Sequence, residues 1–108
     1  MSNYLFIQSQ DPFTETRTRH QYDLALQLFE AGHQVRLLLV QNGVTPARKG
    51  AKTPHFDALL KAGIPISADD FSLQQRQLTL DELKDAVSID PIATAIDALL
   101  DGDKVVWN

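Results

Sequence analysis

Residues 35 to 40, Val-Arg-Leu-Leu-Leu-Val, are the stretch of this sequence that decides its fold. The run is almost continuously apolar and does not alternate between apolar and polar positions. Such a strand is typical of a parallel sheet, because helices cover both faces of that kind of sheet. The stretch therefore predicts a strand that is buried on both sides, in the interior of an α/β domain.

The residues before this stretch predict a first strand and a helix. Residues 4 to 7, Tyr-Leu-Phe-Ile, form a second short apolar run that polar residues and Pro12 bring to an end. From Thr14 onward, apolar residues recur at the spacing of an amphipathic helix, as Tyr22, Ala25, Leu26 and Phe29. Gly32 stands where a helix commonly ends in a left-handed residue. Together these segments form a βαβ unit.

The residues after the stretch predict shorter elements of the same kinds. Residues 43–54 contain Gly, Pro and three basic residues, and they predict a loop. A helix through Phe56, Leu59 and Leu60 is expected next, and it ends at Gly63. A strand from Ile64 to Ser67 and a helix from Phe71 to Leu78 follow. Thr79, with Asp81 and Glu82, predicts a helix start, and the next strand is expected from Ala86 to Ile89.

The end of the chain predicts one more helix and one more strand. Asp90-Pro91 is typical of a helix entry, with Asp as the N-cap and Pro at the first helical position. Ile92, Ala95, Ile96 and Leu99 are expected to form the buried stripe of this helix, which ends at Gly102. Residues 105 to 107, Val-Val-Trp, predict the last strand. The whole is a three-layer α/β sandwich with a mostly parallel sheet of about five strands and helices on both faces.

Composition and charge narrow the class of protein. The chain has 108 residues, of which 44% are hydrophobic and 22% charged, and these values predict a single domain over residues 1–108. The net charge is −4, which argues against general nucleic-acid binding. We expect no membrane partner, because no apolar run approaches the roughly 20 residues of a membrane helix. The N-terminus lacks the basic start of a signal peptide, so we expect a cytoplasmic protein.

The chain contains no cysteine. This absence excludes disulfides, thiolate metal sites, iron–sulfur clusters and cysteine nucleophiles within the chain. None of the three histidines has the spacing of a helical metal site, and no Gly-rich phosphate loop is present, so the sequence predicts no metal and no cofactor. Ser9 and Ser72 have no nearby histidine and acid that would predict a hydrolase triad.

A binding site is expected beyond the carboxyl ends of the strands, where ligands bind to open parallel sheets. Turn chemistry and helix capping are the alternative explanation for the same polar residues, and capping is the expected role of Asp69 and Asp70. His20 is the histidine expected nearest to this site, with an ordinary surface position as its alternative. The segments at these strand ends carry Ser9, Asp11, Asn42, Asp69, Asp70 and Ser88.

A basic rim over the same strand ends is a second possibility. It would attract a small anion such as a phosphate or a nucleotide, and its alternative is a set of solvated side chains. The residues in question are Arg17, Arg19, His20, Arg48, Lys49 and Lys52.

The order of these elements resembles the DsrE/DsrF-like family, small α/β proteins of bacterial sulfur relay that include the TusD-type subunits. The resemblance covers nearly the whole chain. Its marks are residues 28–35, Leu-Phe-Glu-Ala-Gly-His-Gln-Val; residues 41–44, Gln-Asn-Gly-Val; residues 59–66, Leu-Leu-Lys-Ala-Gly-Ile-Pro-Ile; and residues 103–107, Asp-Lys-Val-Val-Trp. The resemblance implies assembly into trimers or hexamers.

One position departs from the family pattern. The resemblance implies a cysteine just after the third strand, a serine three positions later and Arg-Gly about seven positions later. Ser72 and Arg76 match these offsets, but Asp69 stands at the cysteine position and Gln77 replaces the glycine. A persulfide needs a polarisable thiolate, so family-type sulfur transfer on the protein's own residues is excluded.

Two functions remain open at this point. The first is a non-catalytic, oligomeric binding or partner subunit related to intracellular sulfur metabolism, which associates with itself or with related subunits. The second is a small-molecule binding domain, or a minor enzyme, for an anion or nucleotide. Its candidate pocket residues are Ser9, Asp11, His20, Asn42, Asp69, Ser72 and Arg76. We expect Phe13, Phe71 and Trp107 at subunit contacts, because large aromatic residues favour interfaces.

Overall fold

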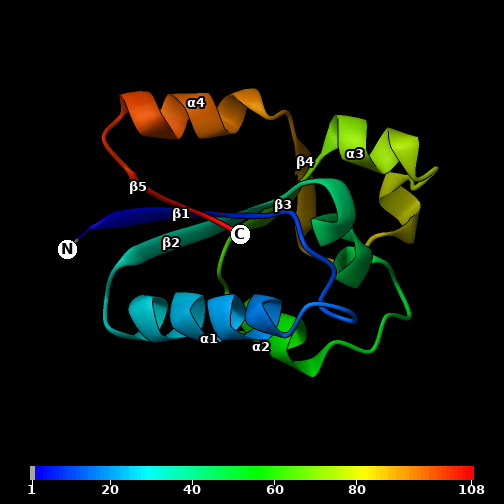
Figure 1. Ribbon diagram of the computed structural model, residues 1–108, viewed down its shortest axis with the longest axis horizontal. Coiled ribbons are helices and arrows are strands. Elements are labelled where there is room, and N and C mark those ends of the chain that lie inside the picture. Colours follow the sequence, from blue (N-terminus) through cyan, green and yellow to red (C-terminus); the bar gives the residue numbers. More distant parts are fainter. Residues whose placement is uncertain (1) are drawn as a thin grey trace.

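A five-stranded sheet forms the middle layer of the computed structural model, which describes residues 2–108 (Figure 1). The strand order is β4-β3-β2-β1-β5, and every neighbouring pair is parallel. The predicted fold class is therefore confirmed. The strands are β1 Asn3–Gln8, β2 Gln34–Leu39, β3 Ile66–Asp69, β4 Val87–Asp90 and β5 Lys104–Trp107.

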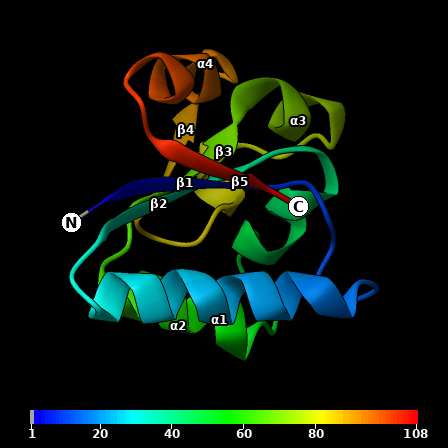
Figure 2. The same cartoon turned by 60° about the vertical axis from the view of Figure 1, so that its left-hand side comes forward.

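Helices cover both faces of the sheet. Both views place α1 and α2 on one face and α4 on the other (Figures 1 and 2). The helices are α1 Thr16–Glu30, α2 Pro54–Ala62, α3 Asp70–Gln75 and α4 Ala93–Leu100, with the 3-10 segments η1 Gln41–Ala47 and η2 Leu80–Glu82. Among residues 2–108, none of the helices has the length and apolar character needed to cross a lipid bilayer.

The strand that decides the fold lies where its sequence predicts. β2 pairs with β1 on one side and with β3 on the other. Its side chains alternate between the two faces: Leu37 and Leu39 face α1 and α2, whereas Leu38 faces α4, and all three are buried. Burial on both faces explains why residues 37–40 of this stretch are continuously apolar.

The two faces carry cores of different size. We call the larger one the α1/α2 core; its buried residues include Phe6, Tyr22, Leu37, Phe56 and Leu59. The ring of Tyr22 meets the ring of Phe56 edge to face, with 5.6 Å between centroids. We call the smaller one the α4 core; its buried residues are Leu5, Ile7, Leu38, Val40, Ala95 and Ala98.

Several predicted boundaries are shifted along the chain. The first helix begins at Thr16 and not at Thr14, and the third strand runs from Ile66 to Asp69 and not from Ile64 to Ser67. Gly32 has a φ of +96°, as predicted for the residue that follows a helix. Thr79 is an N-cap, as the sequence predicts, and it forms a capping box with Glu82, but the segment that it begins is a single 3-10 turn.

The loop expected over residues 43–54 is wrong for its first part. Residues 41–47 form η1, and Gly43, Val44, Pro46 and Ala47 are buried there. Gly43 lies directly against the carbonyl oxygen of Gln8, where a Cβ atom would collide. The close packing of η1 on the end of β1 therefore requires a glycine at position 43. This glycine does not indicate a flexible loop.

The helix entry expected at Asp90-Pro91 is also wrong. Asp90 ends β4, where it lies opposite Asp69 in the parallel ladder, and α4 begins three residues later with Ile92 as its N-cap. The expected buried stripe is mostly exposed. Ala95 is buried, but Ile92, Ile96 and Leu99 face outward, and Ala98 takes the second buried position. The small alanines bring α4 close to the sheet and leave its large apolar residues on the surface.

Candidate functional site

Asp69 and Ser72 form a closed polar network at the carboxyl end of β3. The Oδ2 atom of Asp69 accepts hydrogen bonds from the Ser72 backbone N–H at 3.0 Å and from the Ser72 hydroxyl at 2.8 Å. The Ser72 oxygen in turn accepts the backbone N–H of Gln41 at 2.8 Å. Asp69 is 6% exposed and Ser72 is 3% exposed. Asp69 is thus the predicted N-cap of α3, and it also ties α3 to η1.

Arg76 joins this network to an open pocket. Its Nη1 atom donates to the backbone carbonyl of Ser72 at 3.1 Å, and its Nη2 atom donates to Oδ1 of Asn42 at 2.8 Å. Two hydrogen bonds hold the guanidinium in one orientation, while it keeps further N–H groups for a ligand. We name this hollow the strand-end pocket. Its volume is about 390 Å³, and it is lined by Asp11, Phe13, Asn42, Thr45, Arg48, Arg76 and Leu78.

Asp11 holds one wall of the strand-end pocket in place. Its Oδ1 atom accepts the backbone N–H of Phe13 at 2.8 Å and the hydroxyl of Thr45 at 3.4 Å. These contacts fasten the segment before α1 to η1. The pocket therefore contains one carboxylate, already engaged, together with the guanidinium groups of Arg48 and Arg76. Such a set suits a small anion better than a cation.

The remaining predicted residues lie elsewhere. Ser9 is buried, and its hydroxyl donates to the backbone carbonyl of Asn108 at 2.8 Å, which joins the end of β1 to the end of β5. His20 is exposed on α1 and lines none of the pockets described here. The structure thus brings Asp11, Asn42 and Arg76 together, places Asp69 and Ser72 beneath them, and leaves Ser9 and His20 outside.

Thr45 was not among the predicted site residues, and Arg48 was predicted only as part of a broader basic rim. Both residues reach the pocket through the position of η1, which was expected to be an irregular loop. A signal was present, because Gly43 and Pro46 within a short segment are compatible with a tight helical turn as well as with a loop.

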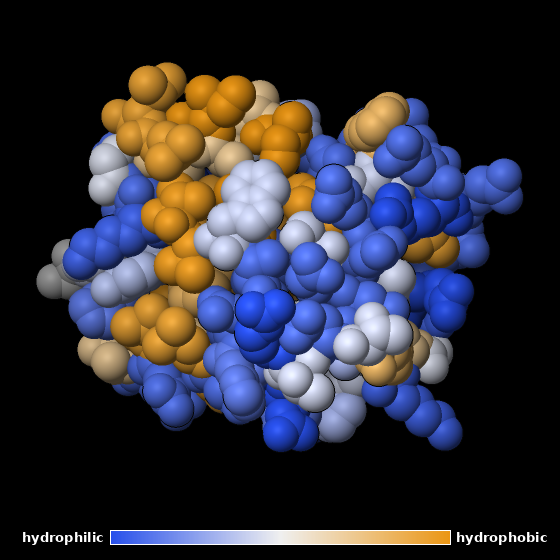
Figure 3. Space-filling view, in the orientation of Figure 1, coloured by the Kyte–Doolittle hydropathy of each residue, from blue (hydrophilic) through white to orange (hydrophobic). Residues whose placement is uncertain are grey.

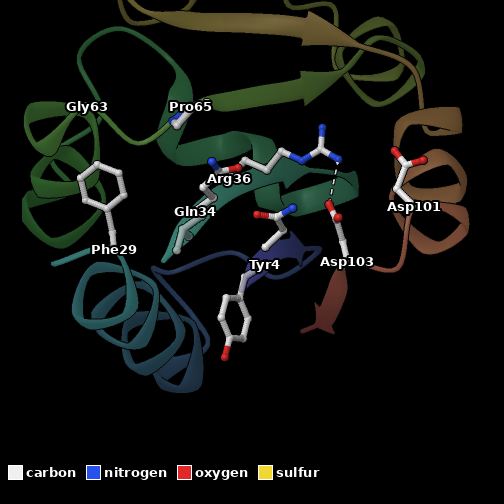
Figure 4. Close-up of a pocket in the computed structure, with 10 residues that line it drawn as sticks. Tyr4, Phe29, Gln34, Arg36, Gly63, Pro65, Asp101 and Asp103 are labelled. Atoms are coloured by element: carbon white, nitrogen blue, oxygen red, sulfur yellow. Dashed lines mark hydrogen bonds and ion pairs between the residues drawn. The ribbon is translucent and has the colours of Figure 1, made fainter. Parts of the chain in front are cut away.

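A larger pocket, of about 600 Å³, lies at the opposite end of the strands, where they begin (Figure 4). Arg36 and Asp103 form an ion pair there, with 3.3 Å between Nη2 and Oδ2. Asn3 and Gln34 mark this edge as the one where β1 and β2 begin. Ligands of open parallel sheets bind beyond the carboxyl ends of the strands, so we regard the strand-end pocket as the candidate site.

Comparisons with known proteins give a family and a fold. The model of the DsrE/DsrF-like family matches residues 2–107. The YchN protein from E. coli has a similar structure, with a TM-score of 0.89 and 20% sequence identity over 100% of both chains.

Two further solved structures share this fold. MTH1491 from Methanobacterium thermoautotrophicum, a protein of unknown function, has a TM-score of 0.80 and 17% identity over 100% of both chains. BT1422 from Bacteroides thetaiotaomicron has a TM-score of 0.77 and 15% identity, covering 98% of this chain and 95% of its own. Among curated proteins, no sequence matches this chain. At these identities the neighbours support the fold alone.

Proposed function

Because this chain belongs to the DsrE/DsrF-like family, we propose that it is a member that carries no sulfur itself and acts as a non-catalytic, oligomeric binding or partner subunit in intracellular sulfur metabolism. The observation that carries this proposal is the state of Asp69. It stands where the family resemblance places the sulfur-accepting cysteine, and it is a buried helix cap.

The chemistry of Asp69 supports a role without catalysis. Sulfur transfer through a persulfide requires a thiolate that attacks sulfane sulfur and then releases it. A carboxylate offers hard oxygen atoms, and here the Oδ2 atom already accepts two hydrogen bonds from Ser72. With no cysteine in the whole chain, a sulfur-carrying thiol would have to come from a partner protein. The chain itself would contribute binding surface.

An exposed apolar surface supports association with other subunits. We define the α4–β5 face as the side chains of Ile92, Ile96, Leu99, Leu100 and Trp107, all of which are exposed. Figure 3 shows hydrophobic residues gathered over α4, whereas the part of the same view over α3 is mainly hydrophilic. A contiguous apolar patch of this kind marks an interaction surface more often than a free one.

The aromatic residues expected at subunit contacts are exposed as well. Trp107 lies on the α4–β5 face, and Phe71 begins the exposed side of α3. Phe13 lines the strand-end pocket. Exposed aromatic rings lose little conformational entropy when a partner covers them, so they favour association.

Size-exclusion chromatography with light scattering tests the proposal on the wild type and on Asp69→Ala. We expect a trimer or hexamer for both proteins, because Asp69 is buried as the cap of α3 and is not one of the exposed residues of the α4–β5 face. Asp69→Ala should lower the free energy of unfolding by about 2 kcal/mol, since it removes a helix cap and leaves the Ser72 N–H and hydroxyl without their acceptor. A wild-type protein that is a monomer at micromolar concentration would overturn the proposal.

A second candidate function is the binding of a small anion in the strand-end pocket. The observation that favours it is the pair Arg48 and Arg76, because Arg76 is already oriented by Asn42. Thermal unfolding in the presence of phosphate, thiosulfate or a nucleotide should show a rise in midpoint, because a ligand that binds only the native state stabilises it. Arg76→Gln should abolish the rise, whereas Lys61→Gln at the end of α2 should retain it. Absence of any shift in the wild type would argue against this function.

A further inference from the structure

The charges of this chain are divided unevenly along its sequence. Residues 1–54 contain six Lys and Arg against four Asp and Glu, whereas residues 55–108 contain four against ten. The α4–β5 face belongs entirely to the acidic half, while the start of α1 and the segment that follows η1 belong to the basic half. A chain with two oppositely charged surfaces attracts further copies of itself, provided that the two surfaces also fit each other.

Carboxylates border the α4–β5 face. Asp97 and Asp101 are exposed and stand one helical turn apart, and Asp97 is also one turn from Leu100. Neither carboxylate forms an ion pair among residues 2–108, and α4 contains no Lys or Arg. Contact of this face with the same face of a second copy would bring these carboxylates toward each other, which is unfavourable.

Cations surround an exposed aromatic ring on a different part of the molecule. Phe13 is 58% exposed and lines two hollows. One is the strand-end pocket, with Arg48 and Arg76; the other, of about 210 Å³, contains Arg19 and Lys52. None of these four cations forms an ion pair among residues 2–108. We call Phe13 and these four cations the Phe13 face.

The Phe13 face keeps a positive balance. Asp11 is the one carboxylate among the residues that line either hollow, so a single negative charge stands against four positive ones. Asp11 also accepts the backbone N–H of Phe13 at 2.8 Å, which holds the segment that carries the exposed ring. The ring is therefore positioned before any partner arrives, and its burial costs little conformational entropy.

The two faces are complementary in shape as well as in charge. The smaller hollow of the Phe13 face has apolar walls from Pro12, Phe13, Pro54 and Phe56. On the α4–β5 face, Leu100 is 81% exposed and projects from the end of α4. An apolar side chain that enters a pocket and is surrounded by charged pairs is the usual construction of a stable contact between proteins.

The two faces lie on different sides of the molecule. α4 covers one face of the sheet, whereas α1 and α2, which line the smaller hollow, cover the other (Figures 1 and 2). A contact between two different surfaces leaves one of each free on the resulting pair, so it continues from copy to copy until a ring closes. A three-fold ring needs such a contact, because a face that binds itself joins only two copies.

We propose that the α4–β5 face of one copy packs on the Phe13 face of the next, in a head-to-tail assembly. Leu100 enters the apolar hollow beside Phe13, and the carboxylates of Asp97 and Asp101 meet the cations of the Phe13 face. This inference rests on the function proposed above, since it names the partner surface of the α4–β5 face. The neighbouring copy also borders the strand-end pocket, because Phe13 lines both hollows.

The salt dependence of assembly distinguishes this contact from pairing of the α4–β5 face with itself. Sedimentation velocity on the wild type between about 0.05 M and about 0.5 M NaCl measures it. Head-to-tail contact predicts that the dissociation constant rises at least about tenfold with salt, because opposite charges are screened from each other. Self-pairing predicts a fall, because salt then screens carboxylates that repel each other.

Charge reversal on either face should produce a monomer at micromolar concentration. One variant carries Asp97→Lys with Asp101→Lys, and the other carries Arg19→Glu with Lys52→Glu. All four positions are exposed, so both variants should keep the circular dichroism spectrum of the wild type. Each variant retains one intact face. An equimolar mixture should therefore re-form a complex that contains both chains, and native mass spectrometry detects it.

The matched control is Asp81→Lys with Asp85→Lys, at exposed positions outside both faces, and it should assemble as the wild type does. A monomeric wild type would overturn the proposed function together with this inference. Three other results would overturn the head-to-tail contact alone, while the wild type still assembles: an Arg19 and Lys52 variant that assembles equally well, a mixture that stays monomeric, or assembly that strengthens with salt.

Discussion

The two faces of the sheet differ in what they bury and in what they expose. On one face, α1 and α2 cover a core with large rings and branched side chains, among them Phe6, Tyr22 and Phe56. On the other face, α4 covers a small core through Ala95 and Ala98 and turns its larger apolar residues outward. The α1/α2 face therefore mainly stabilises the domain, whereas the α4 face has apolar surface left for a partner.

Phe6→Ala should give the largest effect, because it acts on the face that stabilises the domain. Phe6 is fully buried in the α1/α2 core. Its truncation should lower the free energy of unfolding by about 3–5 kcal/mol, through lost apolar burial and a residual cavity. Denaturation in urea, monitored by circular dichroism, measures this loss. A loss below about 1 kcal/mol would mean that the larger core does not carry the stability.

Ala98→Leu tests how closely α4 approaches the sheet. Ala98 is fully buried in the α4 core, so a larger side chain has no space and must push the helix outward. We expect a loss of about 1–3 kcal/mol by the same urea measurement. Ala93→Leu, at the exposed start of α4, is the matched control and should change stability by less than about 0.5 kcal/mol. Equal effects of the two substitutions would contradict the close packing.

Alkaline pH should act on the α1/α2 face through Tyr22. Its pKa is raised in the folded chain, mainly by burial, whereas the unfolded value is about 10. Above that pH the unfolded state binds fewer protons than the native state, so stability should fall with rising pH by about 1.4 kcal/mol per unit. Below pH 10 this contribution is constant. Urea unfolding at pH 9 to 11 measures the slope, and Tyr22→Phe should remove it. A wild-type slope that persists in the variant would assign the effect to other groups.

Leu100→Ser should give the smallest change in stability, since this residue is 81% exposed on the α4–β5 face. We expect a change within about 0.5 kcal/mol in the unfolding free energy of the monomer. Thermal unfolding at low protein concentration provides the comparison with Phe6→Ala. A large loss would show that Leu100 belongs to the core of the single chain and not to an association surface.

The sequence predicts the sheet better than it predicts the last helix, and the reason is physical. The apolar run at residues 35–40 has one interpretation, because a strand buried on both faces needs apolar residues at nearly every position. The apolar stripe of the last helix has two interpretations, because a helix can turn either its small or its large apolar residues toward the sheet. This stripe consists of Ile92, Ala95, Ile96 and Leu99. Tertiary packing chose the small ones, and a single sequence does not encode that choice locally.

The sequence predicted at which end of the strands the candidate site lies, but it did not predict how the residues of the site contact one another. The rule for parallel sheets found Asp11 and Asn42, because each follows a strand end, whereas Arg76 was found through the family resemblance. It could not show that Asp69 is closed off by Ser72, since this depends on β3 ending two residues later than predicted. The hydroxyl of Tyr22 is buried without a hydrogen-bond partner among residues 2–108, and the sequence did not predict this either. An aromatic residue in an amphipathic stripe predicts a core position, and whether its hydroxyl finds a partner depends on residues from other elements.

We propose that this chain works through association, by its α4–β5 face. Size-exclusion chromatography with light scattering on the wild type and on the double variant Ile96→Asp and Leu99→Asp tests it most directly. We predict a trimer or hexamer for the wild type and a folded monomer for the variant, because a carboxylate buried in an apolar interface is costly. A monomeric wild type at micromolar concentration, or a variant that assembles as the wild type does, would contradict the account.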